Sequence, residues 1–515
     1  MTKITIDKDY SQEQYVKDIN TYGLDVTWEN IIEKIKSPTD EFGIISVKNF
    51  GQLYEIGLAH IDKENKKEQG QYFTPHDVAI LLSKYLEKID GENVCDVCCG
   101  TGSLILSYFE VIGEEKTKKL IKNKKIYLYD KDPLALNICK FTIGILYGNE
   151  ENLNCICGDF LDKSITLPEN CKVISNPPYF KITDVKSTWD KTNVLKDSKE
   201  FYSVIIEKII SNSQSSVIIS PYSFLGGDKF YSLRKLMSNY NGKLISFDNV
   251  PGNIFAGKKH GVFNTNTSNS VRATITIVEN KENIKGFRCS GLIRFKNTER
   301  ETLLDVDALE RFIGTQYQTI DEKNKKFIKC FPELEDIYRK WEKHSKPLKS
   351  YIKTKDAVSI CIPNSCRYFT VASYKDLDRS GKHYINLKDN DATKIIYCFL
   401  NSSFAYWHWR LYDGGILYNK SLLESLPIID IDKISEDNKK RLLSIADEMK
   451  SIEEKSLSYK KNAGKMQENI KFPTKYRVEI NNIMLETLGF TCDSSVFDII
   501  HSNTANTISV MEVEE

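Results

Sequence analysis

Short apolar runs recur between residues 92 and 280 and alternate with stretches whose apolar positions have helical spacing. Seven runs have the length and the β-branched and aromatic content of strands: 94–97, 126–129, 154–157, 173–175, 216–219, 244–247 and 273–278. Helical spacing follows three of them, at 133–146, 199–211 and 229–240. This alternation predicts an α/β fold with a doubly wound, mostly parallel sheet and helices on both faces.

The pattern changes on both sides of this region. Residues 1–64 have mixed polarity and predict a helical N-terminal flank. Residues 285–430 are irregular and include an aromatic cluster at 404–410, which we interpret as core, so a separate α+β domain is expected there. Apolar residues three or four positions apart predict a long amphipathic helix over 433–470, within a helical C-terminal region at 431–515.

Composition narrows the class of protein. The chain has 515 residues, 41% of them hydrophobic, which is enough for two or three domains. Its 72 Lys and Arg balance 71 Asp and Glu, so it is not a generic polycation. No run approaches the roughly 18 apolar residues of a membrane span, and we expect no membrane association and a cytoplasmic location. The 13 cysteines are expected to be reduced, and no metal site is predicted because the 7 histidines are scattered.

Polar residues gather where the predicted strands end. The first strand leads through Asp96 into a glycine turn at Gly100 and Gly102 that opens a helix. Glycines let backbone N–H groups approach a ligand, and a helix N-terminus favours an anion such as a carboxylate or phosphate. The second strand ends in Asp130, where a carboxylate can accept both hydroxyls of a ribose.

The third and fourth strands add acceptors and aromatic rings. Asp159 and Phe160 follow the third strand and offer an acceptor and a ring for an adenine. Asn-Pro-Pro-Tyr, residues 176–179, follows the fourth strand. The Asn side-chain oxygen and the carbonyl of Pro177 can both accept hydrogen bonds from a planar NH2 group, and the prolines stiffen the backbone between them. A flat ring can stack on Tyr179.

With these motifs the chain resembles the class I S-adenosylmethionine-dependent DNA methyltransferases that act on adenine N6. Gly-Gln-Tyr-Phe-Thr-Pro at 70–75 is similar to the N-terminal cofactor motif of that family, and its place before the glycine turn matches the gamma class of restriction-modification enzymes. The resemblance spans residues 65–280. It implies S-adenosylmethionine as cofactor, a seven-stranded sheet, a methyltransferase domain at 65–284 and a target-recognition domain for DNA at 285–430.

The resemblance also assigns roles to residues. It implies that the catalytic residues are Asn176, Pro177, Pro178 and Tyr179. It implies that the cofactor is held by Tyr72, Thr74, Pro75, Asp96, Gly100, Gly102, Asp130, Asp159 and Phe160. Tyr179 and Phe255 would contact the target base, with Lys258 and Lys259 near DNA phosphates, although Phe255 fits a core position equally well and paired lysines are more often simply solvated.

The implied chemistry is the transfer of a methyl group to an exocyclic amine of an adenine in double-stranded DNA. Hydrogen bonds from the amine to Asn176 and to the Pro177 carbonyl would favour tetrahedral nitrogen, and no strong base is needed. The adenine has to leave the duplex to reach these groups.

Alternatives differ in substrate and in partners. Asn-Pro-Pro-Tyr also occurs in methyltransferases of glutamine side chains and RNA amines, which are typically shorter and lack the motif at 70–75. The motif at 70–75 is also similar to that of modification subunits that need a separate specificity subunit, although these usually carry a larger helical N-domain. A nuclease partner and a homodimer stay open, and the base sequence recognised cannot be derived from these residues.

Overall fold

The computed structural model describes residues 74–256, 271–281, 283–353, 357–366, 368–413, 417–462 and 465–505. Within them the chain forms two compact units. The first comprises the described residues up to 224, 228–289 and 293–327, and the second comprises 225–227, 290–292 and those from 328 onwards.

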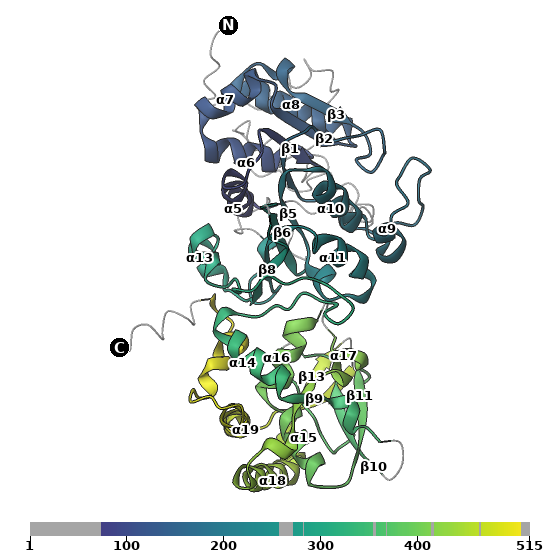
Figure 1. Cartoon of the computed structure of the whole chain (residues 1–515), viewed down its shortest axis with the longest axis vertical. Coiled ribbons are helices and arrows are strands. Elements are labelled where there is room, and N and C mark those ends of the chain that lie inside the picture. The colour runs from purple at the N-terminus through teal and green to yellow at the C-terminus, as the bar shows by residue number, and fades with distance from the viewer. Residues whose placement is uncertain are drawn as a thin grey trace, which may run out of the picture. The chain divides into compact units, whose positions relative to one another are not determined.

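An eight-stranded sheet is the centre of the first unit (Figure 1). Its strands are β1 (Asn93–Val97), β2 (Ile126–Asp130), β3 (Asn154–Cys157), β4 (Cys171–Ser175), β5 (Ser215–Pro221), β6 (Asn241–Phe247), β7 (Ala273–Val278) and β8 (Gly286–Ile293). The spatial order is β3-β2-β1-β4-β5-β7-β6-β8. The first five strands pair in parallel, and β7 is antiparallel to both β5 and β6. The predicted α/β fold with a mostly parallel sheet is therefore confirmed.

The order of the strands determines where a ligand can enter. β1 lies between β2 and β4. From β1 the chain adds β2 and β3 on one side of the sheet and then β4 and β5 on the other, so the strand order reverses between β1 and β4. Such a switch point opens a crevice beyond the carboxyl ends of the strands. The strand ends that carry Asp96, Asp130 and Asn176 all meet at this edge.

The first unit also contains α-helices. They are α5 (His76–Glu87), α6 (Ser103–Ile112), α7 (Glu114–Lys122), α8 (Pro133–Tyr147), α9 (Asn193–Ser198), α10 (Phe201–Asn212), α11 (Tyr231–Met237), α12 (Arg300–Leu303) and α13 (Val306–Glu310). α5 packs on α6, α8 on β2 and β3, and α10 on β5. α8 begins as its sequence predicts, because Asp132 accepts from the backbone N–H of Leu134 at 2.9 Å and Pro133 occupies the first turn.

The prediction of seven strands was wrong by one. β8 begins at Gly286, just beyond residue 284, where the methyltransferase domain was expected to end. It lies next to β6 at the edge of the sheet. Arg288, Ser290 and Gly291 interrupt its apolar residues, so the sequence shows no clear strand pattern although most of the strand is buried.

The second unit combines helices with three small antiparallel pairs of strands. Its helices are α14 (Glu335–Lys343), α15 (Asp391–Leu400), α16 (Ser403–Tyr412), α17 (Lys420–Glu424), α18 (Glu436–Ser451), α19 (Thr474–Thr487) and α20 (Asp498–His501). Its strands are β9 (Ser345–Pro347), β10 (Ala357–Pro363), β11 (Lys382–Lys388), β12 (Pro427–Ile429), β13 (Leu457–Asn462) and β14 (Lys465–Ile470). The aromatic cluster at 404–410 is buried in α16, which confirms that it belongs to the core.

The long helix predicted over 433–470 was wrong beyond residue 451. α18 ends at Ser451, and an antiparallel hairpin of β13 and β14 follows within the region that was expected to be helical. Leu457 and Ile470 pair across this hairpin and pack on a small apolar cluster that includes Val371 and Leu377. The apolar residues with helical spacing lie in or directly after α18, so the prediction was correct for that helix and was extended too far along the chain. Among the described residues, no helix is both long and apolar enough to cross a membrane.

Candidate active site

The glycine turn after β1 requires its glycines. Gly100 has φ +53° and Gly102 has φ +91°, which is the left-handed region that other residues adopt at a cost. A Cβ on Gly102 would also lie 2.5 Å from Sγ of Cys139, whereas a Cβ on Gly100 would meet no atom within 4 Å. Gly100 therefore needs glycine for its backbone alone, and Gly102 needs it for both backbone and space.

Asp96 is a carboxylate that the fold leaves half satisfied. Its side chain is 0% exposed, and Oδ2 accepts from the backbone N–H of Ile105 at 3.0 Å. Oδ1 is buried with no hydrogen-bond partner among the described residues. Burial, opposed by the Ile105 bond and reinforced by the negative charge of Asp130, raises the pKa of Asp96 well above its usual value. A buried acceptor of this kind fits a cationic donor such as an ammonium group.

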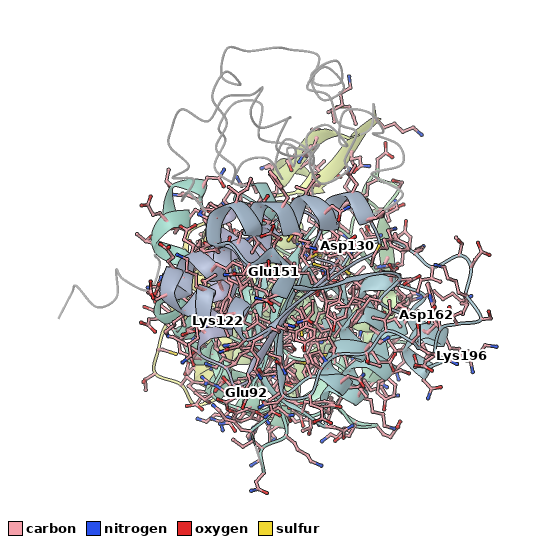
Figure 2. All side chains as sticks on the ribbon, turned by 90° about the horizontal axis from the view of Figure 1, so that it is seen from above. Glu92, Lys122, Asp130, Glu151, Asp162 and Lys196 are labelled. Carbon is pink, nitrogen blue, oxygen red and sulfur yellow. The ribbon has the colours of Figure 1, made fainter. Side chains whose placement is uncertain are left out.

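Asp130 ends β2 and faces the same turn. Its Oδ2 accepts from the N–H of Gly100 at 2.7 Å, and its Oδ1 accepts from the N–H of Asp132 at 2.9 Å. Burial raises the pKa of Asp130, and these two bonds oppose that rise. Figure 2 shows Asp130 well apart from Glu92, which precedes β1 at the other end of the sheet. The hydrogen bonds from the N–H groups of Gly100 and Asp132 hold the Asp130 carboxylate beside the glycine turn.

Asp159 is held by two side chains that the sequence did not indicate. Its Oδ2 accepts from Nζ of Lys186 at 2.6 Å and from the indole N–H of Trp189 at 3.2 Å. Both come from the segment that follows Asn-Pro-Pro-Tyr, and no local motif marks them. Phe160 is 4% exposed and packs edge to face on Tyr129, with ring centroids 5.5 Å apart. In this conformation the ring is part of the core.

Asn176 is oriented from a distant part of the chain. Its side-chain N–H2 donates to Oγ1 of Thr74 at 2.9 Å, across 102 residues of sequence. Its Oδ1 accepts from the hydroxyl of Tyr179 at 2.6 Å, and that hydroxyl also lies 3.4 Å from the carbonyl oxygen of Ile219. In this arrangement the N–H2 of the amide faces Thr74 and its oxygen faces Tyr179.

Aromatic rings surround this acceptor. The ring of Tyr179 lies 6.0 Å from that of Phe255 and 6.1 Å from that of Tyr202, both in edge-to-face contact. Phe255 is 0% exposed and lies in the short helix Ile254–Ala256. Pro177 is buried, Pro178 is partly buried, and Pro75 precedes the first turn of α5. Tyr72, Lys258 and Lys259 lie outside the described residues.

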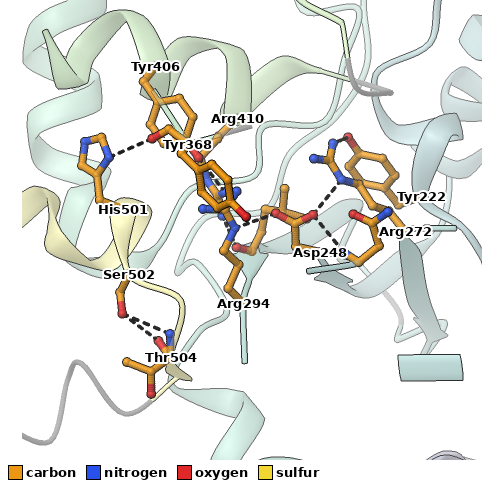
Figure 3. Close-up of polar contacts among 12 residues, drawn as sticks. Tyr222, Asp248, Arg272, Arg294, Tyr368, Tyr406, Arg410, His501, Ser502 and Thr504 are labelled. Atoms are coloured by element: carbon orange, nitrogen blue, oxygen red, sulfur yellow. Dashed lines mark hydrogen bonds and ion pairs between the residues drawn. The ribbon is translucent and has the colours of Figure 1, made fainter. Parts of the chain in front are cut away.

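A buried cluster of charges lies beside the ends of several strands of the large sheet (Figure 3). Asp248, directly after β6, accepts from Nε of Arg272 and from Nε of Arg294, each at 2.8 Å. Arg272 also donates to the hydroxyl of Tyr222 at 2.9 Å. The cluster joins the ends of β5, β6 and β8 to the start of β7.

Several known proteins are similar to this chain. The type I restriction enzyme MpnII methylase subunit of Mycoplasma pneumoniae is 30% identical over 155 residues, 27% of each chain. The release factor glutamine methyltransferase of Clostridium acetobutylicum is 31% identical over 127 residues, 24% of this chain and 41% of that protein. The cryoEM structure of a DrdV-DNA complex covers 79% of this chain and 59% of its own, with 13% identity and a TM-score of 0.45.

These pairwise likenesses are partial, since the chain spans less than half of the length of either curated relative. A family model covers more. The model described as N-6 DNA Methylase matches residues 46–340, which is more than half of the 515 residues and includes every strand of the large sheet. The chain therefore belongs to the N-6 DNA Methylase family.

Proposed function

We propose that this chain is a gamma-class methyltransferase that transfers a methyl group from S-adenosylmethionine to the N6 amine of an adenine in double-stranded DNA. The observation that carries the proposal is the orientation of Asn176. Thr74, from the motif that precedes the glycine turn, receives the amide N–H, so the amide oxygen points toward Tyr179 at the end of β4. A fixed carbonyl acceptor beside an aromatic ring suits a planar amine.

The residues around the glycine turn suit the cofactor. When bound, S-adenosylmethionine supplies an electrophilic methyl group on a sulfonium centre. Asp96 would pair its buried Oδ1 with the ammonium group of the methionine part, which would supply the missing partner and favour the charged form of the carboxylate. Asp130 would accept from the ribose hydroxyls, and Gly100 and Gly102 let the backbone approach the ligand.

Two further positions complete the cofactor site. Asp159 would accept from the adenine amino group of the cofactor while Trp189 keeps the carboxylate in place. Thr74 and Pro75, with Tyr72 of the same motif, would line the side of the pocket nearest Asn176. Phe160 would contribute through its contact with Tyr129, because its ring is buried in this conformation.

The catalytic role of Asn176 is to orient and polarise the amine. Its Oδ1 and the carbonyl of Pro177 would accept the two amine hydrogens, which directs the nitrogen lone pair toward the methyl group. The Tyr179 hydroxyl occupies one of these acceptors now, at 2.6 Å, so the amine would take its place. The tyrosine ring is then released to stack on the base.

Phe255 would form the second wall of the base site. Its ring and that of Tyr179 pack edge to face at 6.0 Å, so they have to separate for a base to enter between them. Lys258 and Lys259, which follow it in sequence, would contact DNA phosphates. Residues 285–430 are proposed to read the base sequence, although β8 of this segment belongs to the large sheet.

A second candidate function is a modification subunit that depends on a separate specificity subunit. The likeness to the Mycoplasma pneumoniae protein, a methylase subunit of a type I restriction enzyme, favours this candidate. The catalytic and cofactor residues would be the same, and only the source of DNA recognition would differ.

Transfer of labelled methyl from S-adenosylmethionine by the purified chain tests the proposal, with unmethylated DNA, RNA and protein as parallel acceptors. N6-methyladenine at one recurring DNA sequence supports a self-sufficient enzyme. Transfer to DNA only after a specificity subunit is added supports the second candidate. Labelling of RNA or protein instead of DNA contradicts both.

A further inference from the structure

Arg300 is a buried cation that links two distant parts of the first unit. It opens α12 and its side chain is 1% exposed. Its Nη2 donates to Oδ1 of Asp77 at 3.0 Å, and its Nε donates to the other carboxylate oxygen. On its other side, Nη1 donates to the carbonyl oxygen of Asn253 at 3.0 Å and Nη2 donates to that of Ile254 at 2.6 Å. A single planar guanidinium thus spans two segments.

Each of these segments leads directly to the proposed active site. Asp77 lies in the first turn of α5, three residues after Thr74, which holds the Asn176 amide. Asn253 and Ile254 immediately precede Phe255, whose ring contacts Tyr179. The spacing between the amine acceptor and the second aromatic wall is therefore set partly through Arg300.

The chemistry of this contact favours a positioning role. Burying an ion pair costs desolvation free energy, and an apolar pair of similar volume is often at least as stabilising. What the fork-shaped guanidinium adds is direction, because it binds a carboxylate with two parallel bonds while it donates to backbone carbonyls in the same plane. A lysine ammonium at this position keeps the charge and loses that geometry.

We propose that Arg300 is a positioning residue that couples the cofactor pocket to the turn carrying Phe255. The proposal rests on the proposed function, since it assumes that S-adenosylmethionine binds beside Thr74 and α5. Ordering of the start of α5 by the cofactor then tightens the 253–256 turn through the guanidinium. The second wall of the base site is assembled only when the methyl donor is present.

Amide hydrogen exchange of the full chain, with and without S-adenosylmethionine, tests the coupling without DNA. In the unaltered protein we expect the cofactor to slow exchange at α5 and also at residues 253–256, by about fivefold or more. In Arg300→Lys the slowing at α5 is expected to remain, and that at 253–256 to fall to less than about twofold. Asp77→Asn, which weakens the same contact from the other side, should give the same result if Arg300→Lys fails to fold.

Arg288→Lys is the matched control. Arg288 is a partly buried arginine of β8 that bonds the Gly314 carbonyl oxygen at 2.8 Å and Glu310 at 3.0 Å, and neither partner leads to the site. In Arg288→Lys, S-adenosylmethionine should slow amide hydrogen exchange at residues 253–256 as much as it does in the unaltered protein. In methyl transfer, Arg300→Lys should lower kcat by about 10²-fold with little change in the KM for S-adenosylmethionine.

The outcomes separate the two proposals. If the cofactor slows exchange at α5 but not at 253–256 in the unaltered protein, or if Arg300→Lys transmits the effect fully, the role of Arg300 is refuted and the cofactor site stands. If the cofactor slows exchange nowhere near α5, the proposed cofactor site fails first and the coupling falls with it.

Discussion

Replacing Asp96 by Asn should stabilise the protein and weaken cofactor binding at the same time. The carboxylate is fully buried, and Oδ1 has no partner among the described residues. A buried polar group left unsatisfied costs about 1–3 kcal/mol, and more if it is charged. Asn keeps an oxygen for the Ile105 N–H and places its NH2 where Oδ1 has no partner in the described part of the chain, so the substitution removes the charge and not the unsatisfied position. We therefore expect Asp96→Asn to raise the local free energy of opening by about 1–3 kcal/mol at a pH above the folded pKa of Asp96.

The pH dependence gives the sign of this effect. Burial raises the pKa of Asp96 in the folded protein, so folding favours its protonated form. The unaltered protein then loses stability as the pH rises through the folded pKa of Asp96, whereas the Asn variant does not. The advantage of Asp96→Asn should be full at high pH and should vanish below about pH 4, the ordinary pKa of an aspartate.

Cofactor affinity should change in the opposite direction. A hydrogen bond to a charged group contributes about 1.5–3 kcal/mol, so loss of the carboxylate should weaken S-adenosylmethionine binding by about 10- to 150-fold. Isothermal titration calorimetry at pH 8 measures this change directly. Unchanged affinity would remove Asp96 from the cofactor site.

Amide hydrogen exchange of β1 and α6 measures the stability change, with variant and unaltered protein compared at each pH so that intrinsic exchange rates cancel. Asp162→Asn is the control, because the contribution of Asp162 to stability should depend on pH in the opposite direction to that of Asp96. Bonds from Ser164 lower the pKa of Asp162, which therefore adds stability above its unfolded pKa and loses it as the pH falls. A uniform gain for Asp96→Asn at every pH, or no gain, would refute the reasoning about its buried charge.

Two further predictions concern the walls of the cofactor site. Gly102→Ala should lower the thermal unfolding midpoint more than Gly100→Ala. Both substitutions cost about 1–2 kcal/mol because φ is positive, and only the Cβ at position 102 overlaps Cys139. Equal decreases in the midpoint, or no recovery when Cys139→Ala is added to Gly102→Ala, would contradict this. Trp189→Phe removes a hydrogen bond to Asp159. In a fluorescence titration with S-adenosylmethionine, the variant should lose most of the change in tryptophan emission that the unaltered protein shows. A full change in the variant would show that Trp189 does not respond to the site.

The strand-end chemistry could be predicted because it is local in sequence. Asp130 and Asn176 each follow a short apolar run, and parallel strands bring their carboxyl ends to one edge whatever the loops do. All seven predicted strands are present, and 154–157 and 273–278 have the same bounds in the structure. Short apolar runs were sufficient to predict β4, β5 and β7 because these strands are buried on both faces.

What could not be predicted depends on contacts between distant residues. Arg300 contacts Asp77 across 223 residues, and Lys186 and Trp189 contact Asp159, and no motif marks Arg300, Lys186 or Trp189 in the sequence. β8 was also missed, because the polar residues within it interrupt the apolar pattern although most of the strand is buried. The helical spacing at Leu442, Ile445 and Met449 predicted α18 correctly and was extended too far, into a hairpin whose Leu457 and Ile470 pack in a cluster with distant residues of the chain.

The central claim is that the Asn176 amide positions an adenine amine, and the most direct test is methyl transfer by Asn176→Ala. Labelled S-adenosylmethionine, unmethylated DNA and any required specificity subunit would be used with both proteins, and binding of the cofactor would be measured in parallel. We predict N6-methyladenine with the unaltered chain, and no detectable transfer with Asn176→Ala although it still binds S-adenosylmethionine. Transfer by Asn176→Ala at the rate of the unaltered chain would contradict the account.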